Sequence, residues 1–416
     1  MRWLNQAFPG GLLLLLLALL PVSPAAATDT DEIGARITIR AEDLPAPYAT
    51  PVEALSPRRV STNKEGELTL PPGFRVQAFR KDLTHARWLH ALPNGDVLLA
   101  EPRGSKITLL RDADGDGEAE TERALVTGLD TPHGMAIIGE WLYIGERMQL
   151  SRVPFGVGDL EVTGEVEEVT EIGSFGDGAG HSTRILLHDP AENVLYIAIG
   201  SRSNIGVEAL PRATIQKYYL GENRMETFAS GLRNPVGMDF NPETGALYTV
   251  VNERDGYGDG LVPDYLTEVK EGGFYGWPYA YSGQIPDPDY GAEAPEMVAK
   301  SILPDVLFQS HSASLGLAFY TGTQFPEEYR GDAFVSFQGS WNASVPTGYK
   351  IVRVPFENGR PLDYYENFAT GFRIETGQPG AAHVWGRPIG LAVAADGSLL
   401  IADAVSQTVW RISYGE

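Results

Sequence analysis

The chain of 416 residues contains no cysteine. It can form no disulfide, so a secreted protein of this composition depends on its apolar core for stability. The same absence excludes a thiolate metal site, a lipid-modified cysteine anchor and a covalently attached c-type haem. If the protein is a redox enzyme, its electrons must pass to a separate acceptor.

Positive charge is also scarce. Lys and Arg total 32 against 55 Asp and Glu, which gives a net charge of −23. A nucleic acid backbone would be repelled by this field, so no nucleic acid partner is expected. A neutral or anionic small molecule remains compatible if basic residues gather locally. No Gly-rich strand-to-helix fingerprint is present, so a nicotinamide cofactor is not expected.

Long apolar runs are limited to one, at residues 11–20. The run follows Arg2 and precedes a stretch of small residues that ends at Ala27. This order predicts a signal peptide over residues 1–27, cleaved after Ala27, and a periplasmic or secreted protein. A membrane anchor is the alternative, but a span needs about 20 apolar residues. No other segment has that character, so we expect no membrane span after cleavage.

Long segments of helical periodicity are absent as well, and a pattern of short strands recurs six times instead. Each unit has a polar start, a short apolar strand, a Gly-containing turn and a second apolar strand. Repeats of roughly 40–50 residues built from short strands are typical of a propeller. The sequence therefore predicts an all-β, six-bladed β-propeller. The six starts lie at Arg87, Pro132-His133, His181, Arg233-Asn234, Ser314 and Arg387.

The two ends of the chain suggest how this propeller closes. Residues 74–79 alternate as a strand, and the last repeat ends with the strand 408–412. We expect the early strand to complete the last blade and so remove an open edge. Residues 28–65 are polar and contain four prolines, which indicates a linker or an N-terminal arm. The catalytic propeller is predicted over residues 66–416.

Propeller geometry brings the starts of the innermost strands to one end of a central channel. His181 is the sharpest candidate there, because His is the usual general base near neutral pH. A structural His that caps a strand is the alternative. Arg233 with Asn234, and Arg387 in the same register, suit an anionic or quinonoid ligand, whereas surface ion pairs would explain them otherwise. Arg87 and His133 would join the same site.

Two turns resemble cation sites. The turn 252–256 gathers oxygen ligands that suit Ca²⁺, although this signal is weak by itself. The run Asp112, Asp114 and Asp116 matches the opening of an EF-hand loop, but its twelfth position is Arg123 instead of Glu. A solvated hairpin turn is the preferred interpretation of the second loop, with a structural calcium as the alternative.

Several long motifs, in order, resemble the glucose/sorbosone dehydrogenase family, and the sorbosone dehydrogenase branch in particular. The resemblance covers about residues 70–414. Its motifs are Gly180-His181-Ser182-Thr183-Arg184, Ala229-Ser230-Gly231-Leu232-Arg233-Asn234-Pro235, Val251-Asn252-Glu253-Arg254-Asp255-Gly256, Gly272-Gly273-Phe274-Tyr275-Gly276-Trp277-Pro278, Gly339-Ser340-Trp341-Asn342 and Gly386-Arg387-Pro388-Ile389-Gly390.

The resemblance implies oxidation of an aldose or sugar aldehyde with pyrroloquinoline quinone and Ca²⁺, and transfer of electrons to a separate cytochrome or quinone. It implies that His181 is the general base and that Arg233 and Asn234 contact the quinone. Arg387 would bind the cofactor's carboxylates, and the backbone carbonyls of Arg254 and Asp255 would hold calcium.

Three positions depart from the family pattern: Ser182 replaces an aromatic residue, Gln338 a His, and Trp385 an Arg of the glucose-oxidising branch. These departures bear on the choice of substrate. Two other functions stay open from the residues themselves. A propeller can bind a sugar or a protein without catalysis. A calcium-dependent sugar lactonase would need several convergent carboxylates at an axial metal.

Overall fold

The computed structural model describes residues 29–375 and 380–415. Strands dominate this part of the chain, and its one α-helix is α1 (Pro295–Lys300). Single 3-10 turns lie at Ala41–Asp43, Pro102–Gly104, Gly291–Glu293 and Glu327–Tyr329. The all-β expectation is confirmed. The predicted signal peptide lies outside the described residues, and within them no helix combines the length and apolar character of a membrane span.

Six sheets of four or five strands follow one another along the described chain, and their pairs are antiparallel except for β15 (Arg224–Ser230) with β19 (Gly273–Phe274), which is parallel. The first contains β4 (Trp88–Ala91), β5 (Val97–Glu101), β6 (Lys106–Arg111) and β7 (Thr121–Thr127), and the second β8 (Met135–Ile138), β9 (Trp141–Gly145), β10 (Leu150–Pro154) and β11 (Glu167–Glu168). The third contains β12 (Arg184–Asp189), β13 (Val194–Ile199), β14 (Thr214–Tyr219), β15 (Arg224–Ser230) and β19 (Gly273–Phe274).

The fourth sheet contains β16 (Pro235–Phe240), β17 (Leu247–Val251), β18 (Tyr265–Glu268) and β22 (Val306–Leu307). The fifth contains β23 (Ser314–Phe319), β24 (Ala333–Phe337), β25 (Lys350–Val354), β28 (Tyr365–Ala369) and β1 (Arg36–Ile37). The sixth contains β31 (Pro388–Val393), β32 (Leu399–Asp403), β33 (Thr408–Tyr414) and β3 (Phe74–Arg80).

Three smaller sheets complete the described strands. They join β2 (Arg58–Arg59), β30 (His383–Val384) and β29 (Arg373–Ile374); β20 (Ala280–Tyr281) and β21 (Ile285–Pro286); and β26 (Phe356–Glu357) and β27 (Arg360–Pro361).

The early strand β3 pairs antiparallel with β33, so strands from the two ends of the chain share one sheet. This confirms the predicted pairing. Phe74 lies opposite Tyr414, and its ring also packs edge-on against Phe325 and Phe368. The join is therefore secured by aromatic packing as well as by backbone hydrogen bonds.

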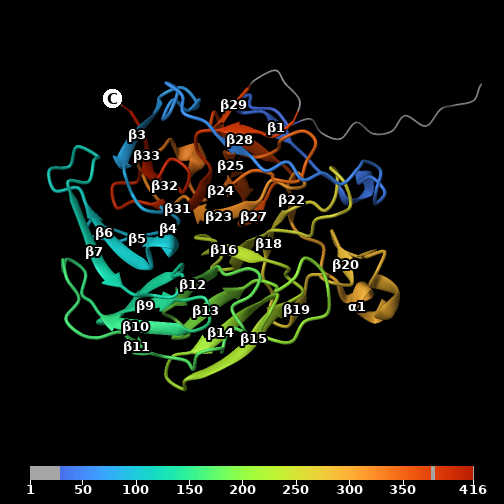
Figure 1. Cartoon of the computed structure of the whole chain (residues 1–416), viewed down its shortest axis with the longest axis horizontal. Coiled ribbons are helices and arrows are strands. Elements are labelled where there is room, and N and C mark those ends of the chain that lie inside the picture. The colour runs from blue at the N-terminus through green and yellow to red at the C-terminus, as the bar shows by residue number, and fades with distance from the viewer. Residues whose placement is uncertain (1–28, 376–379, 416) are drawn as a thin grey trace, which may run out of the picture.

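The first strand of each large sheet packs against the first strand of the next, and β31 packs against β4. Figure 1 shows the sheets arranged in chain order around the centre of the molecule. Glycines make this approach possible. A Cβ on Gly134 would lie 2.5 Å from the Arg184 carbonyl oxygen, and one on Gly316 would lie 2.2 Å from that of Ile389. The backbones of neighbouring inner strands thus come closer than any side chain would allow.

Residues before position 66 lie against the sheets. β1 pairs with β28 at the edge of the fifth sheet, and β2 runs parallel to β30. Near the start of the described chain, Asp29 forms a buried ion pair of 2.6 Å with Lys350. Further along, Leu55 N–H donates to the carbonyl of Trp341. The arm therefore contacts loops that follow several different strands.

Candidate active site

The polar starts of the inner strands are electrostatic neighbours in the structure. The charge of Arg387 acts on Arg87, and the charges of Arg87 and Arg184 act on His133. His181 in turn interacts with Arg184, Arg233 and Asp255. The fold therefore brings together residues separated by up to 300 positions, as the repeat pattern predicts.

His181 lies just before β12, in a loop that starts at Asp177. Its backbone N–H donates to the carbonyl of Ser201, and its Nδ1 lies 2.9 Å from the same oxygen. Since a carbonyl only accepts, the proton of the neutral ring sits on Nδ1 and Nε2 carries the lone pair. The side chain is half-buried, so Nε2 is the nitrogen available to a ligand.

Burial, helped by the charge of Arg233, lowers the pKa of His181 to about 4. The ring is therefore neutral over the physiological range. A neutral imidazole with a free Nε2 is the state that a general base requires.

Arg87, His133 and Arg387 form what we call the basic cluster. The Arg387 guanidinium donates to the carbonyls of Gln338 (2.9 Å) and Gly339 (2.6 Å). His133 is buried, and its Nδ1 lies 2.9 Å from the Thr131 carbonyl. Burial lowers its pKa to about 3, with a contribution from Arg87.

Arg87 differs from the other arginines of the site. It is half-buried, and within the described residues its guanidinium has no hydrogen bond and no ion pair. Burial lowers its pKa to about 10, and the charges of Arg387 and Arg103 act in the same direction. Two guanidinium groups that act on each other's charge favour an anionic ligand, because a bidentate acceptor such as a carboxylate can bond to both.

Arg233 is almost fully buried, and protein oxygens take up most of its donors. Nη1 donates to the carbonyls of Asn252 (3.1 Å) and Glu253 (2.8 Å). Nε and Nη2 donate to the backbone and side-chain oxygens of Asn204 at 3.0 and 2.9 Å. Arg233 therefore braces the turn 252–255 and adds positive charge beside His181.

Asn234 is buried next to Arg233. Its Oδ1 has no hydrogen-bond partner within the described residues. A Cβ on Gly200 would lie 2.2 Å from this oxygen, so only glycine fits opposite it. The Asn234 amide oxygen can therefore still accept a hydrogen bond, since no described protein group donates to it.

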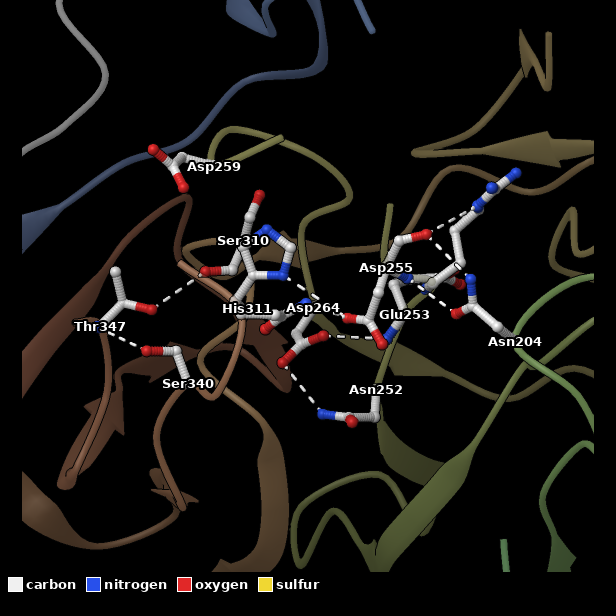
Figure 2. Close-up of polar contacts among 12 residues, drawn as sticks. Asn204, Asn252, Glu253, Asp255, Asp259, Asp264, Ser310, His311, Ser340 and Thr347 are labelled. Carbon is white, nitrogen blue, oxygen red and sulfur yellow. Dashed lines mark hydrogen bonds and ion pairs between the residues drawn. The ribbon is translucent and has the colours of Figure 1, made fainter. Parts of the chain in front are cut away.

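The turn 252–255 contains the predicted calcium ligands. The Arg254 side chain forms a buried ion pair with Asp287 at 2.6 Å, and its Nε lies 3.4 Å from the Asp255 carbonyl. The Asp255 carboxylate accepts from Asn342 at 2.7 Å and lies 3.5 Å from His311. Figure 2 shows Asp255 between His311 and Asn204. These neighbours lower the pKa of Asp255 against the opposing effect of its burial.

Two further buried carboxylates, those of Asp264 and Glu253, lie at this turn. Asp264 accepts from the backbone N–H groups of Glu253 and Ser314 and from the side chain of Asn252, as Figure 2 shows in part. Burial raises the pKa of Asp264 to about 6 and that of Glu253 to about 7. The three carboxylates together give the turn an oxygen-rich, negative character that is chemically compatible with a hard cation.

The loop of Asp112, Asp114 and Asp116 is a hairpin connection between β6 and β7, as predicted. The three carboxylates and Glu120 lie within 4.8 Å of one another, mostly exposed. The loop is far along the hairpin from the inner strands, so it does not belong to the site.

Sequence reasoning missed several residues that shape the site. Asn204 joins Arg233 to the Asp255 backbone, and His311 contacts Asp255 while its Nε2 lies 2.9 Å from the Gly258 carbonyl. Neither lies in a repeat start. Arg184 lies inside the motif 180–184, but the motif by itself indicates no role for it.

The sequence profile of the TrAA12-like family matches residues 68–260 and 294–414, which is most of the chain. The chain belongs to the TrAA12-like family. The sorbosone dehydrogenase branch suggested by the motifs remains a prediction.

Individual relatives are consistent with this TrAA12-like assignment. An uncharacterized protein of Borreliella burgdorferi is 33% identical over 239 residues, or 56% of this chain and 61% of that protein. The aldose sugar dehydrogenase YliI of Escherichia coli is 34% identical over 110 residues, or 25% of this chain and 27% of that protein. The chain thus aligns with less than two thirds of either curated relative.

Among solved structures, the holo form of the pyranose dehydrogenase PQQ domain from Coprinopsis cinerea superposes with a TM-score of 0.70. The superposition covers 86% of this chain and 99% of that one, at 20% sequence identity. At this identity the likeness shows a shared fold.

Proposed function

We propose that this TrAA12-like protein is a quinone-dependent sugar oxidoreductase that oxidises an aldose or sugar aldehyde, sorbosone-like compounds included. We further infer that its six large sheets are the blades of a six-bladed propeller. One observation carries the functional proposal: the charge of Arg387 acts on Arg87, neither guanidinium forms an ion pair with a carboxylate among the described residues, and a neutral His181 belongs to the same group of strand starts.

The residues fit pyrroloquinoline quinone, which carries carboxylates and quinone oxygens. Arg87 and Arg387 would hold carboxylates, with His133 beside them as a neutral, buried neighbour. Asn234 offers an unused acceptor for an N–H or O–H group of the ligand, and the neighbouring Arg233 adds positive charge. When bound, the quinone would supply the two-electron acceptor that amino-acid side chains lack.

The protein's own contribution is proton transfer and orientation. His181 Nε2 accepts the proton of the sugar hydroxyl, because Nδ1–H is committed to the Ser201 carbonyl. The negative charge of Asp255 stabilises the positive charge that develops on the imidazole, since it raises the pKa of His181. The low pKa of the resting ring ensures that the base is unprotonated before substrate binds.

The turn 252–255 would hold Ca²⁺ through backbone carbonyls of Arg254 and Asp255, with the Asp255 carboxylate nearby. A bound calcium would add fixed positive charge next to the cofactor. Removal of calcium by a chelator should therefore abolish activity, and added calcium should restore it. Full activity in protein shown by elemental analysis to be metal-free would contradict this part of the proposal.

The proposal predicts dye-linked oxidation of aldoses by protein loaded with pyrroloquinoline quinone and Ca²⁺. His181→Ala should lower turnover by about two to four decades, the usual weight of a general base. His188→Ala is the matched control, because His188 lies at the other end of β12 and should leave turnover unchanged.

An inactive wild-type protein that still binds sugar would favour a binding propeller, and hydrolysis of sugar lactones would favour a lactonase. Equal turnover in wild type and His181→Ala would remove His181 from its role. The predicted signal peptide and external electron acceptor belong to the same proposal, with export to the periplasm or beyond.

A further inference from the structure

Arg184 is a fully buried arginine beside the proposed base, at the start of β12. Its Nη1 donates to the carbonyls of His181 (2.7 Å) and Thr183 (2.8 Å). Its Nε and Nη2 have no hydrogen-bond partner within the described residues, and no carboxylate there forms an ion pair with it. The guanidinium is thus a buried charge whose strongest contact is the backbone of His181.

A second buried arginine reaches the same carbonyl from another strand connection. Arg212 Nη1 lies 3.4 Å from the His181 carbonyl and 3.3 Å from that of Gly200. Its Nη2 donates to the Ala179 carbonyl at 2.9 Å and to Asp177 at 3.0 Å. The loop 177–183 is therefore tied to two guanidinium groups along most of its length.

This loop has no regular structure to hold it. Gly178 and Gly180 adopt φ angles of +75° and +71°, which side chains disfavour, so the loop has intrinsic freedom. A Cβ on Gly180 would lie 2.2 Å from the Arg202 carbonyl oxygen, so the backbone also turns in a confined space. The position of His181 is therefore set by polar contacts, which are its own bonds to the Ser201 carbonyl and the bonds that its carbonyl accepts from Arg184 and Arg212.

We propose that Arg184 and Arg212 form an arginine clamp: two positioning residues that fix the His181 backbone so that Nε2 stays directed at the ligand. The clamp deepens the proposed function, since it rests on His181 as the base. Neither Arg184 nor Arg212 is among the residues that would contact cofactor or substrate, so the clamp gives them a separate, supporting role.

Charge and burial agree with this role. After burial and Arg233, the charge of Arg184 is among the causes that lower the pKa of His181. Burial and the charges of Arg212 and Arg147 lower the pKa of Arg184 itself to about 9, so the fold holds this cation at a cost. An apolar side chain of similar volume at position 184 would make the protein more stable. The buried charge of Arg184 therefore indicates a role in positioning its neighbour His181.

The test compares Arg184→Met and Arg184→Lys with Arg152→Met as the matched control. Arg152 stacks on Trp141 and pairs with Glu167 at the outer part of the second sheet. The first readout uses protein without cofactor: the pH titration of the His181 ring by NMR, assigned with His181→Ala. Arg184→Met should raise the pKa of His181, since a like charge is removed. Arg152→Met should not move it.

The second readout is turnover of the loaded enzyme. Both Arg184 variants should lower kcat by about 10- to 100-fold with little change in KM, because a misplaced base slows the chemical step. Arg184→Lys keeps the charge, so it should lose turnover while the pKa of His181 stays close to that of the wild type. Arg212→Lys should behave like Arg184→Lys and serves as the second variant if Arg184→Met does not fold.

An unchanged His181 titration in Arg184→Met, or full kcat in Arg184→Lys and Arg212→Lys, would overturn the clamp. An inactive wild-type enzyme would instead overturn the proposed function. The NMR titration would still test the clamp in that case, because it requires neither quinone nor sugar.

Discussion

Arg87→Met separates the stability of the fold from its capacity to bind an anion. Burial and the neighbouring Arg387 and Arg103 lower the pKa of Arg87 to about 10. A shift of this size corresponds to roughly 3 kcal/mol of unfavourable free energy in the folded state. The cost is present throughout the neutral range, because the guanidinium stays charged at every pH below its folded-state pKa.

Methionine fills a similar length without charge. We therefore expect Arg87→Met to stabilise the protein without cofactor by about 1–3 kcal/mol, as replacement of unpaired buried charges does elsewhere. The same change should weaken binding of pyrroloquinoline quinone by about one to two decades, since a charge-assisted hydrogen bond contributes roughly 1.5–3 kcal/mol.

Thermal unfolding with and without the quinone measures both effects. Wild type should gain about 2.7 kcal/mol at a quinone concentration 100 times the Kd, and Arg87→Met should gain far less. Arg123→Met is the control, because Arg123 is exposed on β7, and it should change neither quantity. A destabilised Arg87→Met protein that binds the quinone as tightly as wild type would refute the reasoning.

Three further predictions follow from the buried charges. The kcat/KM of the loaded enzyme should stay level as pH falls and decline only near pH 4, the pKa of His181; an acid limb near its ordinary value of about 6.5 would contradict the buried geometry. Glu253 has a raised pKa of about 7, so the folded state binds its proton more tightly than the unfolded state and stability falls as pH rises from about 4 to 7. Glu253→Gln should flatten that slope in denaturant titrations, and an unchanged slope would argue against it. Asp29→Asn should cost about 1.5–3 kcal/mol, because it removes the charge of the nearer of the two carboxylates paired with buried Lys350 and leaves Asp31 at 3.4 Å, and Lys350→Met in the same protein should recover part of the loss; equal stability of wild type and Asp29→Asn would place the pair outside the folded core.

The repeat pattern was predictable because it depends on local physics. The predicted strand 74–79 corresponds to β3, and the predicted strand 408–412 lies within β33. Alternation of apolar residues and Gly-rich turns determine such elements without reference to the rest of the chain. The starts of the inner strands followed, and with them His181 and Arg387.

The supporting contacts were not predictable because they join distant loops. Arg212 and His181 are 31 positions apart, and Asn204 and Asp255 are 51 apart. The pairing of β1 with β28 links two-residue segments more than 300 positions apart, too short to show any periodicity. Such contacts follow from tertiary packing, which a single sequence does not display.

The central claim is that the ring of basic residues around His181 binds an anionic quinone. A crystal structure of the protein soaked with pyrroloquinoline quinone and Ca²⁺ tests it most directly. We predict one quinone with carboxylates within hydrogen-bond distance of the Arg87 and Arg387 guanidinium groups and with His181 Nε2 facing its reactive carbonyl. Saturating quinone that leaves these residues without added density, or that binds elsewhere on the protein, would contradict the claim.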